Sequence, residues 1–120
     1  MYLKKLLIFF ISVIFFSSCS TADQEKKSIT IVTTTGILGD CVSQIVDGQA
    51  EVVSIMGAGV DPHLYKASQG DISKLSEADI IVYNGLHLEG KMAQMLKNFS
   101  KTKPVFAIGD YIEKSDLKQV

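Results

Sequence analysis

The residues best suited to chemistry in this sequence are its two histidines, His63 and His87. His63 ends a segment, residues 57–63, in which two glycines and Pro62 surround Asp61. Glycine lets the backbone turn sharply, whereas proline fixes its own φ and favours an extended conformation for the residue before it. The pattern predicts a stiffened turn, just after an apolar strand, that presents the imidazole of His63. By itself this position fits either a ligand-binding histidine or a turn histidine that binds nothing.

The N-terminus has the pattern of an export signal followed by a tether. A basic pair precedes an apolar run at residues 6–16 that is too short to span a bilayer. Small residues then precede Cys19, which resembles the lipobox of bacterial lipoproteins, in which the cysteine is acylated and becomes the mature N-terminus. We therefore expect a signal peptide at residues 1–18, a lipid anchor on Cys19 and a flexible polar tether at residues 19–28. The alternative is a cleaved secretory signal in which Cys19 is incidental.

Composition and charge indicate a globular protein. Of the 120 residues, 47% are hydrophobic and 21% are charged, and the net charge is −1. These values are typical of one small domain or part of a larger protein, and they give no electrostatic basis for binding nucleic acid. If Cys19 is lipidated, Cys41 is the only cysteine left, so no intrachain disulfide is expected. We interpret Cys41 as a small core residue, because it falls among apolar residues at helical spacing.

From Ile29 onward, apolar strands alternate with amphipathic helices. Short apolar and β-branched runs predict strands at residues 29–34, 51–56, 78–83 and 104–108. Apolar residues at helical spacing predict helices at residues 37–46, after Ser68 as N-cap, and at residues 88–99. Helices between apolar strands favour right-handed crossovers. We therefore expect an α/β fold with a parallel four-stranded sheet and helices on both of its faces.

A parallel sheet brings the loops that follow its strands to one edge. Thr35, His63 and His87 each lie shortly after a predicted strand, so all three are expected at the same edge. In open α/β sheets this is the edge at which ligands bind. Two histidines at one edge, with a few polar groups, indicate a binding cleft more strongly than either histidine alone.

Several segments together resemble the metal-ion receptor family, the zinc- and manganese-binding solute-binding proteins of bacterial ABC importers. They are the three threonines at residues 33–35, Gly-Val-Asp-Pro-His at residues 59–63, residues 68–79, and Tyr-Asn-Gly-Leu-His-Leu-Glu at residues 83–89. The resemblance extends over about residues 29–110. In that family the metal lies between two α/β lobes joined by a long helix. The first lobe gives two histidines, and the second gives an aspartate together with a histidine or glutamate.

The resemblance implies roles for particular residues. It places the first metal-binding histidine at His63 and implies that the other ligands follow Val120. Asp61, His87 and Thr35 are then expected in the cleft wall or beside the ligands, without binding the metal themselves. Residues 29–120 look like an incomplete N-terminal lobe whose second lobe is absent. One imidazole does not hold a metal ion tightly, so the function that the resemblance implies needs the missing lobe.

That function is metal capture without catalysis. The resemblance implies an exported, membrane-anchored lipoprotein, periplasmic or on the cell surface. Such a receptor would be a monomer that binds Zn²⁺ or Mn²⁺ as its transported ligand and delivers it to an ABC permease. One alternative is a surface adhesin or interaction lipoprotein on the same scaffold, which would not respond to metal. The other is a metal-dependent hydrolase that uses His63 and His87, although no candidate general base accompanies that pair.

Overall fold

The computed structural model of the protein describes residues 28–118. The predicted signal peptide, the candidate lipid anchor Cys19 and residues 20–27 of the predicted tether lie outside this part of the chain. Within it, none of the helices combines the length and the apolar character that crossing a bilayer requires.

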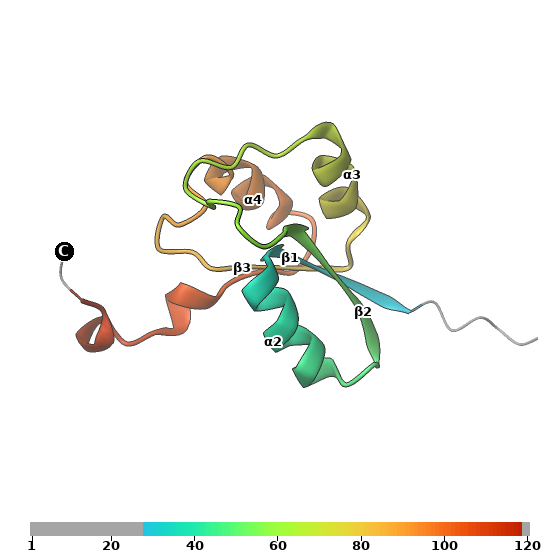
Figure 1. The fold of residues 1–120 in the computed structure, drawn as a ribbon, viewed down its shortest axis with the longest axis horizontal. Helices are drawn as coiled ribbons and strands as arrows, with labels where there is room; N and C mark the ends of the chain where they lie inside the picture. Colours follow the sequence, from blue (N-terminus) through green and yellow to red (C-terminus); the bar gives the residue numbers. More distant parts are fainter. Residues whose placement is uncertain (1–27, 119–120) are drawn as a thin grey trace, which may run out of the picture.

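Strands and helices alternate along the described chain (Figure 1). In order, the elements are β1 (Ile29–Thr35), α2 (Gly36–Val46), β2 (Ala50–Met56), α3 (Gln69–Glu77), β3 (Ile80–Tyr83), α4 (Ala93–Phe99) and β4 (Val105–Ala107), followed by the 3-10 helices η1 (Ile108–Tyr111) and η2 (Lys114–Asp116). The four predicted strands are all present, each within two residues of its predicted bounds.

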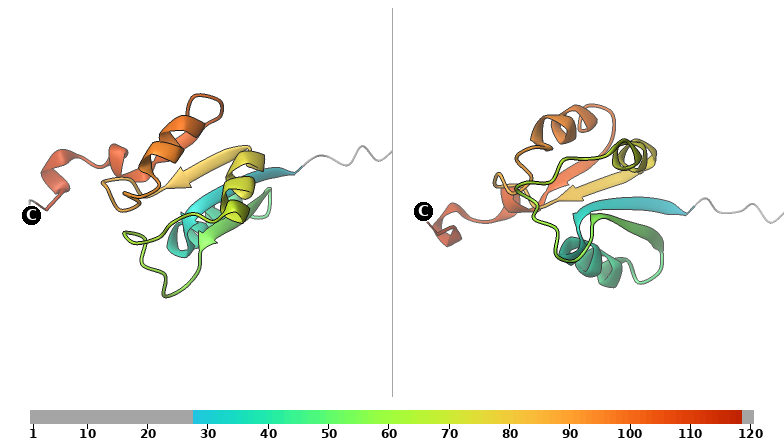
Figure 2. Two further views of the ribbon diagram at one scale, coloured as in Figure 1. Left: turned by 90° about the horizontal axis from the view of Figure 1, so that it is seen from above. Right: turned by 45° about the horizontal axis from the view of Figure 1, so that its top comes forward.

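The strands form one parallel sheet in the order β2-β1-β3-β4. From β1 the chain steps to β2, then crosses to β3 on the other side of β1, so the direction of connection reverses between β1 and β3. Right-handed crossovers then place α2 on one face and α3 with α4 on the other, as Figure 1 and Figure 2 show. The predicted α/β fold, a parallel four-stranded sheet with helices on both faces, is confirmed.

The apolar core lies between the sheet and helices α3 and α4. Val32 of β1 and Ile81 of β3 are paired neighbours in the sheet. They belong to one buried cluster with Leu75 of α3 and Leu96 of α4, and none of the four is more than 1% exposed. Burial of such a side chain contributes about 1.5–3 kcal/mol. This layer therefore holds the two central strands, whose carboxyl ends form the middle of the candidate binding edge.

The opposite face, under α2, is closely packed and partly polar. Gly39 allows this approach, because a Cβ at that position would overlap the hydroxyl of Ser54. Cys41 is exposed, so its interpretation as a core residue is wrong. Helical spacing indicated an apolar face but not which row of it meets the sheet. The apolar residues of α2 that are partly buried form a neighbouring row: Leu38, Val42 and Val46.

Helix α4 is shorter than predicted. The apolar spacing predicts a helix at residues 88–99, but α4 begins at Ala93. Residues 85–92 form turns instead, in which the N–H of Leu88 donates to the carbonyl of Gly85 and the N–H of Met92 to the carbonyl of Glu89. Glu89 also binds backbone N–H groups at the end of β3. This contact folds the segment back against the strand and so delays the start of the helix.

Candidate functional site

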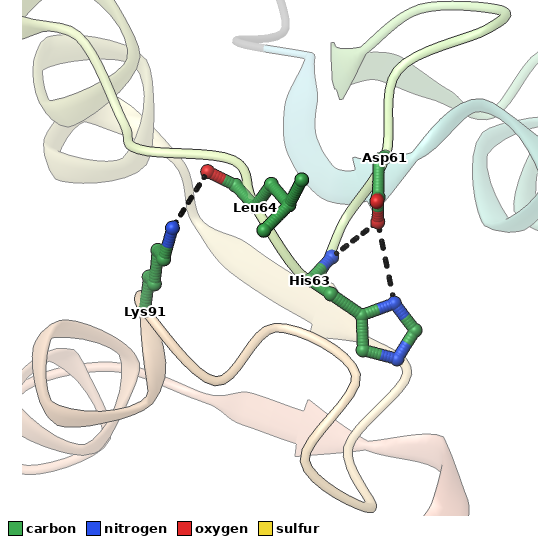
Figure 3. A network of polar contacts seen from close by, with 4 residues as sticks. All are labelled: Asp61, His63, Leu64 and Lys91. Atoms are coloured by element: carbon green, nitrogen blue, oxygen red, sulfur yellow. Dashed lines mark hydrogen bonds and ion pairs between the residues drawn. The ribbon is translucent and has the colours of Figure 1, made fainter.

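His63 lies in the loop between β2 and α3, at the carboxyl edge of the sheet. Oδ1 of Asp61 accepts two hydrogen bonds from it, one from the backbone N–H at 2.9 Å and one from ring Nδ1 at 3.2 Å (Figure 3). An ionised carboxylate only accepts hydrogen bonds, so the contact of Asp61 with the ring is a hydrogen bond in the tautomer that carries its proton on Nδ1. In the neutral ring Nε2 then keeps its lone pair. A carboxylate orients metal-ligating histidines in the same way.

The predicted turn is present in this loop. The N–H of Val60 donates to the carbonyl of Gly57, and the N–H of Leu64 donates to the carbonyl of Asp61. Gly59 has a φ of +79°, a conformation that glycine adopts without steric cost. The side chains of His63 and Asp61 are 65% and 54% exposed. An exposed pair of this kind adds little to stability, so its main effect is on the orientation of the ring.

The far end of the loop is fastened to the start of α3. Ser68 is the N-cap predicted from the sequence, and it forms a capping box with Asp71. One oxygen of the Asp71 carboxylate, Oδ2, also accepts hydrogen bonds from the hydroxyl of Tyr65 at 2.7 Å and from the hydroxyl of Ser68 at 2.6 Å. Two residues beyond His63, the chain is therefore held by a buried carboxylate.

These contacts shift two pKa values. Burial disfavours the ionised Asp71 carboxyl, but the hydrogen bonds from Ser68 and Tyr65 and the nearby Lys74 outweigh burial, and the pKa of Asp71 is lowered. The pKa of Tyr65 is raised, first by the hydrogen bond that its hydroxyl donates to Asp71 and then by burial and by the negative charge of that carboxylate. Both shifts favour the charge states that make the contact, a carboxylate and a neutral phenol.

Glu89 joins the ends of the two central strands. Its side chain is 2% exposed. Oε1 accepts the Thr34 hydroxyl at 2.6 Å and both the backbone N–H and the side-chain amide of Asn84 at 2.8 Å, while Oε2 accepts the N–H of Gly85 at 3.1 Å. A buried carboxylate is stable only when hydrogen bonds replace its hydration. Four donors from β1 and from the loop after β3 do so here.

The loop after β3 is held in a strained conformation. Gly85, Leu86 and His87 have φ values of +79°, +50° and +67°, and left-handed backbone is unfavourable for the two residues that are not glycine. Gly109 secures the loop from the other side. Its N–H donates to the carbonyl of Asn84 at 2.7 Å, and a Cβ on Gly109 would lie only 2.9 Å from that carbonyl oxygen.

The predicted site residues lie at one edge of the sheet but in different surroundings. Thr35 is the N-cap of α2, and its hydroxyl also accepts the side-chain amide of Asn84 at 3.2 Å. It lines a cavity of about 470 Å³ together with Pro62. His87 lines another cavity, of about 280 Å³, and His63 borders neither of these two. Within residues 28–118, no three His, Cys, Asp or Glu side chains gather as a metal site would require.

Two contacts in this region were not predicted from the sequence. The sequence indicates Glu89 only as the last residue of the motif at residues 83–89, and the second contact is the one that Lys91 makes. The Nζ of Lys91 donates to the carbonyl of Leu64 at 3.3 Å, which links the loop after β3 to the His63 loop (Figure 3). A carboxylate shortly after an Asn-Gly turn was the only signal for the first contact. The sequence holds no signal for the second.

Comparisons with known proteins agree with this arrangement. The family described as zinc-uptake complex component A, periplasmic, matches residues 31–119. The manganese-binding lipoprotein MntA of Bacillus subtilis is 44% identical over 101 residues, which cover 84% of this chain and 32% of MntA. The manganese ABC transporter substrate-binding lipoprotein PsaA of Streptococcus pneumoniae is 32% identical over 120 residues, with 92% of this chain and 39% of PsaA covered.

A solved structure extends the likeness to three dimensions. The periplasmic zinc-binding protein TroA of Treponema pallidum aligns with 78% of this chain and 34% of its own at a TM-score of 0.75 and 40% sequence identity. The fold of this chain is thus the fold of the aligned part of that zinc-binding protein. The chain belongs to the family of the periplasmic zinc-uptake component, and the resemblance seen in the sequence is confirmed. It spans about a third of the length of the curated relatives it matches.

Proposed function

We propose that the chain forms the first lobe of an extracytoplasmic receptor that captures Zn²⁺ or Mn²⁺ for an ABC import permease. The observation that carries this proposal is the imidazole of His63. It stands exposed at the carboxyl edge of the sheet, and Asp61 holds its ring through Nδ1. Such a ring offers Nε2 to a cation. The names of the relatives, which bind manganese or zinc, support the choice of metal.

The remaining ligands would come from the part of the complete protein that lies outside this chain. Zn²⁺ accepts imidazole nitrogen readily, whereas Mn²⁺ favours more oxygen ligands, so those ligands would set the preference between the two metals. In this proposal residues 29–120 are the N-terminal lobe, and Thr35, Asp61 and His87 support or border the site without binding the metal. The metal is cargo, and no catalytic step is required of the protein.

The role of His63 can be tested on the complete gene product, including any residues beyond Val120. We expect Zn²⁺ or Mn²⁺ to raise its melting temperature, and His63→Ala to remove most of that rise. His87→Asn is the matched control, because it also removes an imidazole while asparagine tolerates the left-handed backbone at this position. It should keep most of the rise. A metal-dependent rise that persists in His63→Ala would refute the assignment.

The proposal also includes a lipid anchor on Cys19, after cleavage of residues 1–18. Relatives named as substrate-binding lipoproteins of metal ABC transporters support an extracytoplasmic, membrane-attached protein. We expect cells that express the protein to incorporate labelled palmitate into it, and Cys19→Ser to abolish incorporation and release the protein from the membrane fraction. Cys41→Ser is the matched control and should retain the label. Labelling that survives in Cys19→Ser would contradict the anchor.

A further inference from the structure

The segment that carries His63 has few attachments to the rest of the fold. Most hydrogen bonds of residues 58–64 join two residues of the same loop. They include the bonds that Asp61 accepts from His63. Within residues 28–118, a single hydrogen bond links residues 58–64 to any element outside the loop. That bond is the one from the Nζ of Lys91 to the carbonyl of Leu64.

Lys91 lies in the loop after β3 and reaches this carbonyl from there. Figure 3 shows its ammonium group directed at the carbonyl oxygen of Leu64, the residue next to His63. A lysine ammonium is a point donor on a flexible stem, and this hydrogen bond is exposed, so it restrains the carbonyl only as far as the backbone of the lysine is itself fixed. The backbone here is fixed two residues earlier, where the buried Glu89 binds Thr34 and Asn84.

The charge of Lys91 makes its position informative. A positive side chain beside a cation site repels the cation and on electrostatic grounds alone weakens its binding. Replacing that lysine by a neutral residue would then tighten metal binding. If Lys91 instead holds the His63 loop in place, its loss weakens binding. The two effects have opposite signs, so the direction of the change identifies which one dominates.

We infer that Lys91 is a positioning residue for the metal ligand His63. It acts through the carbonyl of Leu64, and the backbone next to it is held by the hydrogen bonds of Glu89. This inference rests on the proposed function, since it assumes that His63 binds the metal. Lys91 would act through the carbonyl of Leu64 and not as a metal ligand. It limits where the loop can place the imidazole before the metal arrives, and preorganisation of this kind raises affinity.

The test compares Zn²⁺ affinity among variants of the complete gene product, measured by competition with a chromogenic chelator. We expect Lys91→Met to weaken binding about fivefold, the effect of losing one partly solvated hydrogen bond from a charged donor, and Lys91→Arg to restore most of it. Lys66→Met is the matched control. Lys66 is an exposed lysine on the same loop and makes no side-chain hydrogen bond within residues 28–118, so its loss should leave affinity unchanged or slightly higher.

Each outcome decides the inference. Unchanged or tighter binding in Lys91→Met, or a loss of equal size in Lys66→Met, would overturn it, and thermal melting of the metal-free variants verifies that they are folded. A second readout does not depend on metal, because amide hydrogen exchange at His63 and Leu64 should be faster in metal-free Lys91→Met than in the wild type. If wild-type protein binds no Zn²⁺, the proposed function fails. The exchange measurement alone then decides whether Lys91 restrains the His63 loop.

Discussion

Two loops at the same edge of the sheet are built in opposite ways. The loop after β3 is locked by the buried carboxylate of Glu89 and by Gly109, and it holds two residues in left-handed conformations. The loop after β2, which carries His63, is exposed and is linked to the neighbouring loop by one lysine. The difference separates a loop that buried hydrogen bonds hold in place from a loop whose link to its neighbour lies at the surface.

The largest loss of stability is expected from removal of the Glu89 carboxylate. Glu89→Ala leaves hydrogen-bond donors of Thr34, Asn84 and Gly85 without their partner in a buried site. Each buried donor left unsatisfied costs about 1–3 kcal/mol, and water entering the space would recover part of this. We expect a loss of about 4 kcal/mol in the free energy of unfolding, measured by urea denaturation of the metal-free complete gene product.

Two variants calibrate this result. Glu77→Ala removes the same group from the exposed end of α3, and we expect a change within about 0.5 kcal/mol. Glu89→Gln keeps the shape and one acceptor oxygen, so its loss should be intermediate. If Glu89→Ala were no more destabilising than Glu77→Ala, the loop after β3 would not be the locked member of the pair.

The structural features that depend on local sequence pattern could be predicted. Runs of β-branched residues predicted the strands, Ser68 as an N-cap predicted the start of α3, and glycine with proline predicted the turn before His63. Contacts between distant residues could not be predicted. Glu89 binds Thr34 across 55 positions, and Lys91 binds the Leu64 carbonyl across 27. Helical spacing likewise did not tell which row of α2 meets the sheet, because that depends on where Gly39 lets the helix approach.

A smaller effect is expected where the His63 loop joins α3. Asp71→Asn removes the negative charge of the group that accepts hydrogen bonds from the hydroxyls of Tyr65 and Ser68. We expect the free energy of unfolding to fall by about 2 kcal/mol at pH 7. The folded-state pKa of Asp71 is lowered below its ordinary value of 3.8. Its stabilising effect is therefore fully present above pH 3.8 and is lost as the pH falls through the folded-state pKa.

The difference between wild type and Asp71→Asn should accordingly shrink in acid. Urea denaturation at pH 7 and at a series of values below pH 3.8 would measure it. Asp40→Asn, on the exposed side of α2, removes the same charge and should change stability at pH 7 by no more than about 0.5 kcal/mol. A difference for Asp71→Asn that stays constant from neutral pH into strong acid would mean that the carboxylate form does not stabilise this end of the loop.

The smallest expected difference is the one between a matched pair of glycine variants, one in each loop. Gly59 and Gly85 both have a φ of +79°, so alanine meets the same backbone strain at either position, about 1 kcal/mol. The surroundings differ. No atom lies within 4 Å of a Cβ added at Gly59, whereas a Cβ at Gly85 would lie 3.1 Å from the Cβ of Ala107. Gly85→Ala should therefore destabilise the protein more than Gly59→Ala, by about a further 1 kcal/mol of overpacking.

Urea denaturation of the two variants side by side measures this difference, which isolates packing from backbone strain. Equal losses would mean that the loop after β3 yields as easily as the loop that carries His63, and the contrast between the two would then lie only in their hydrogen bonds.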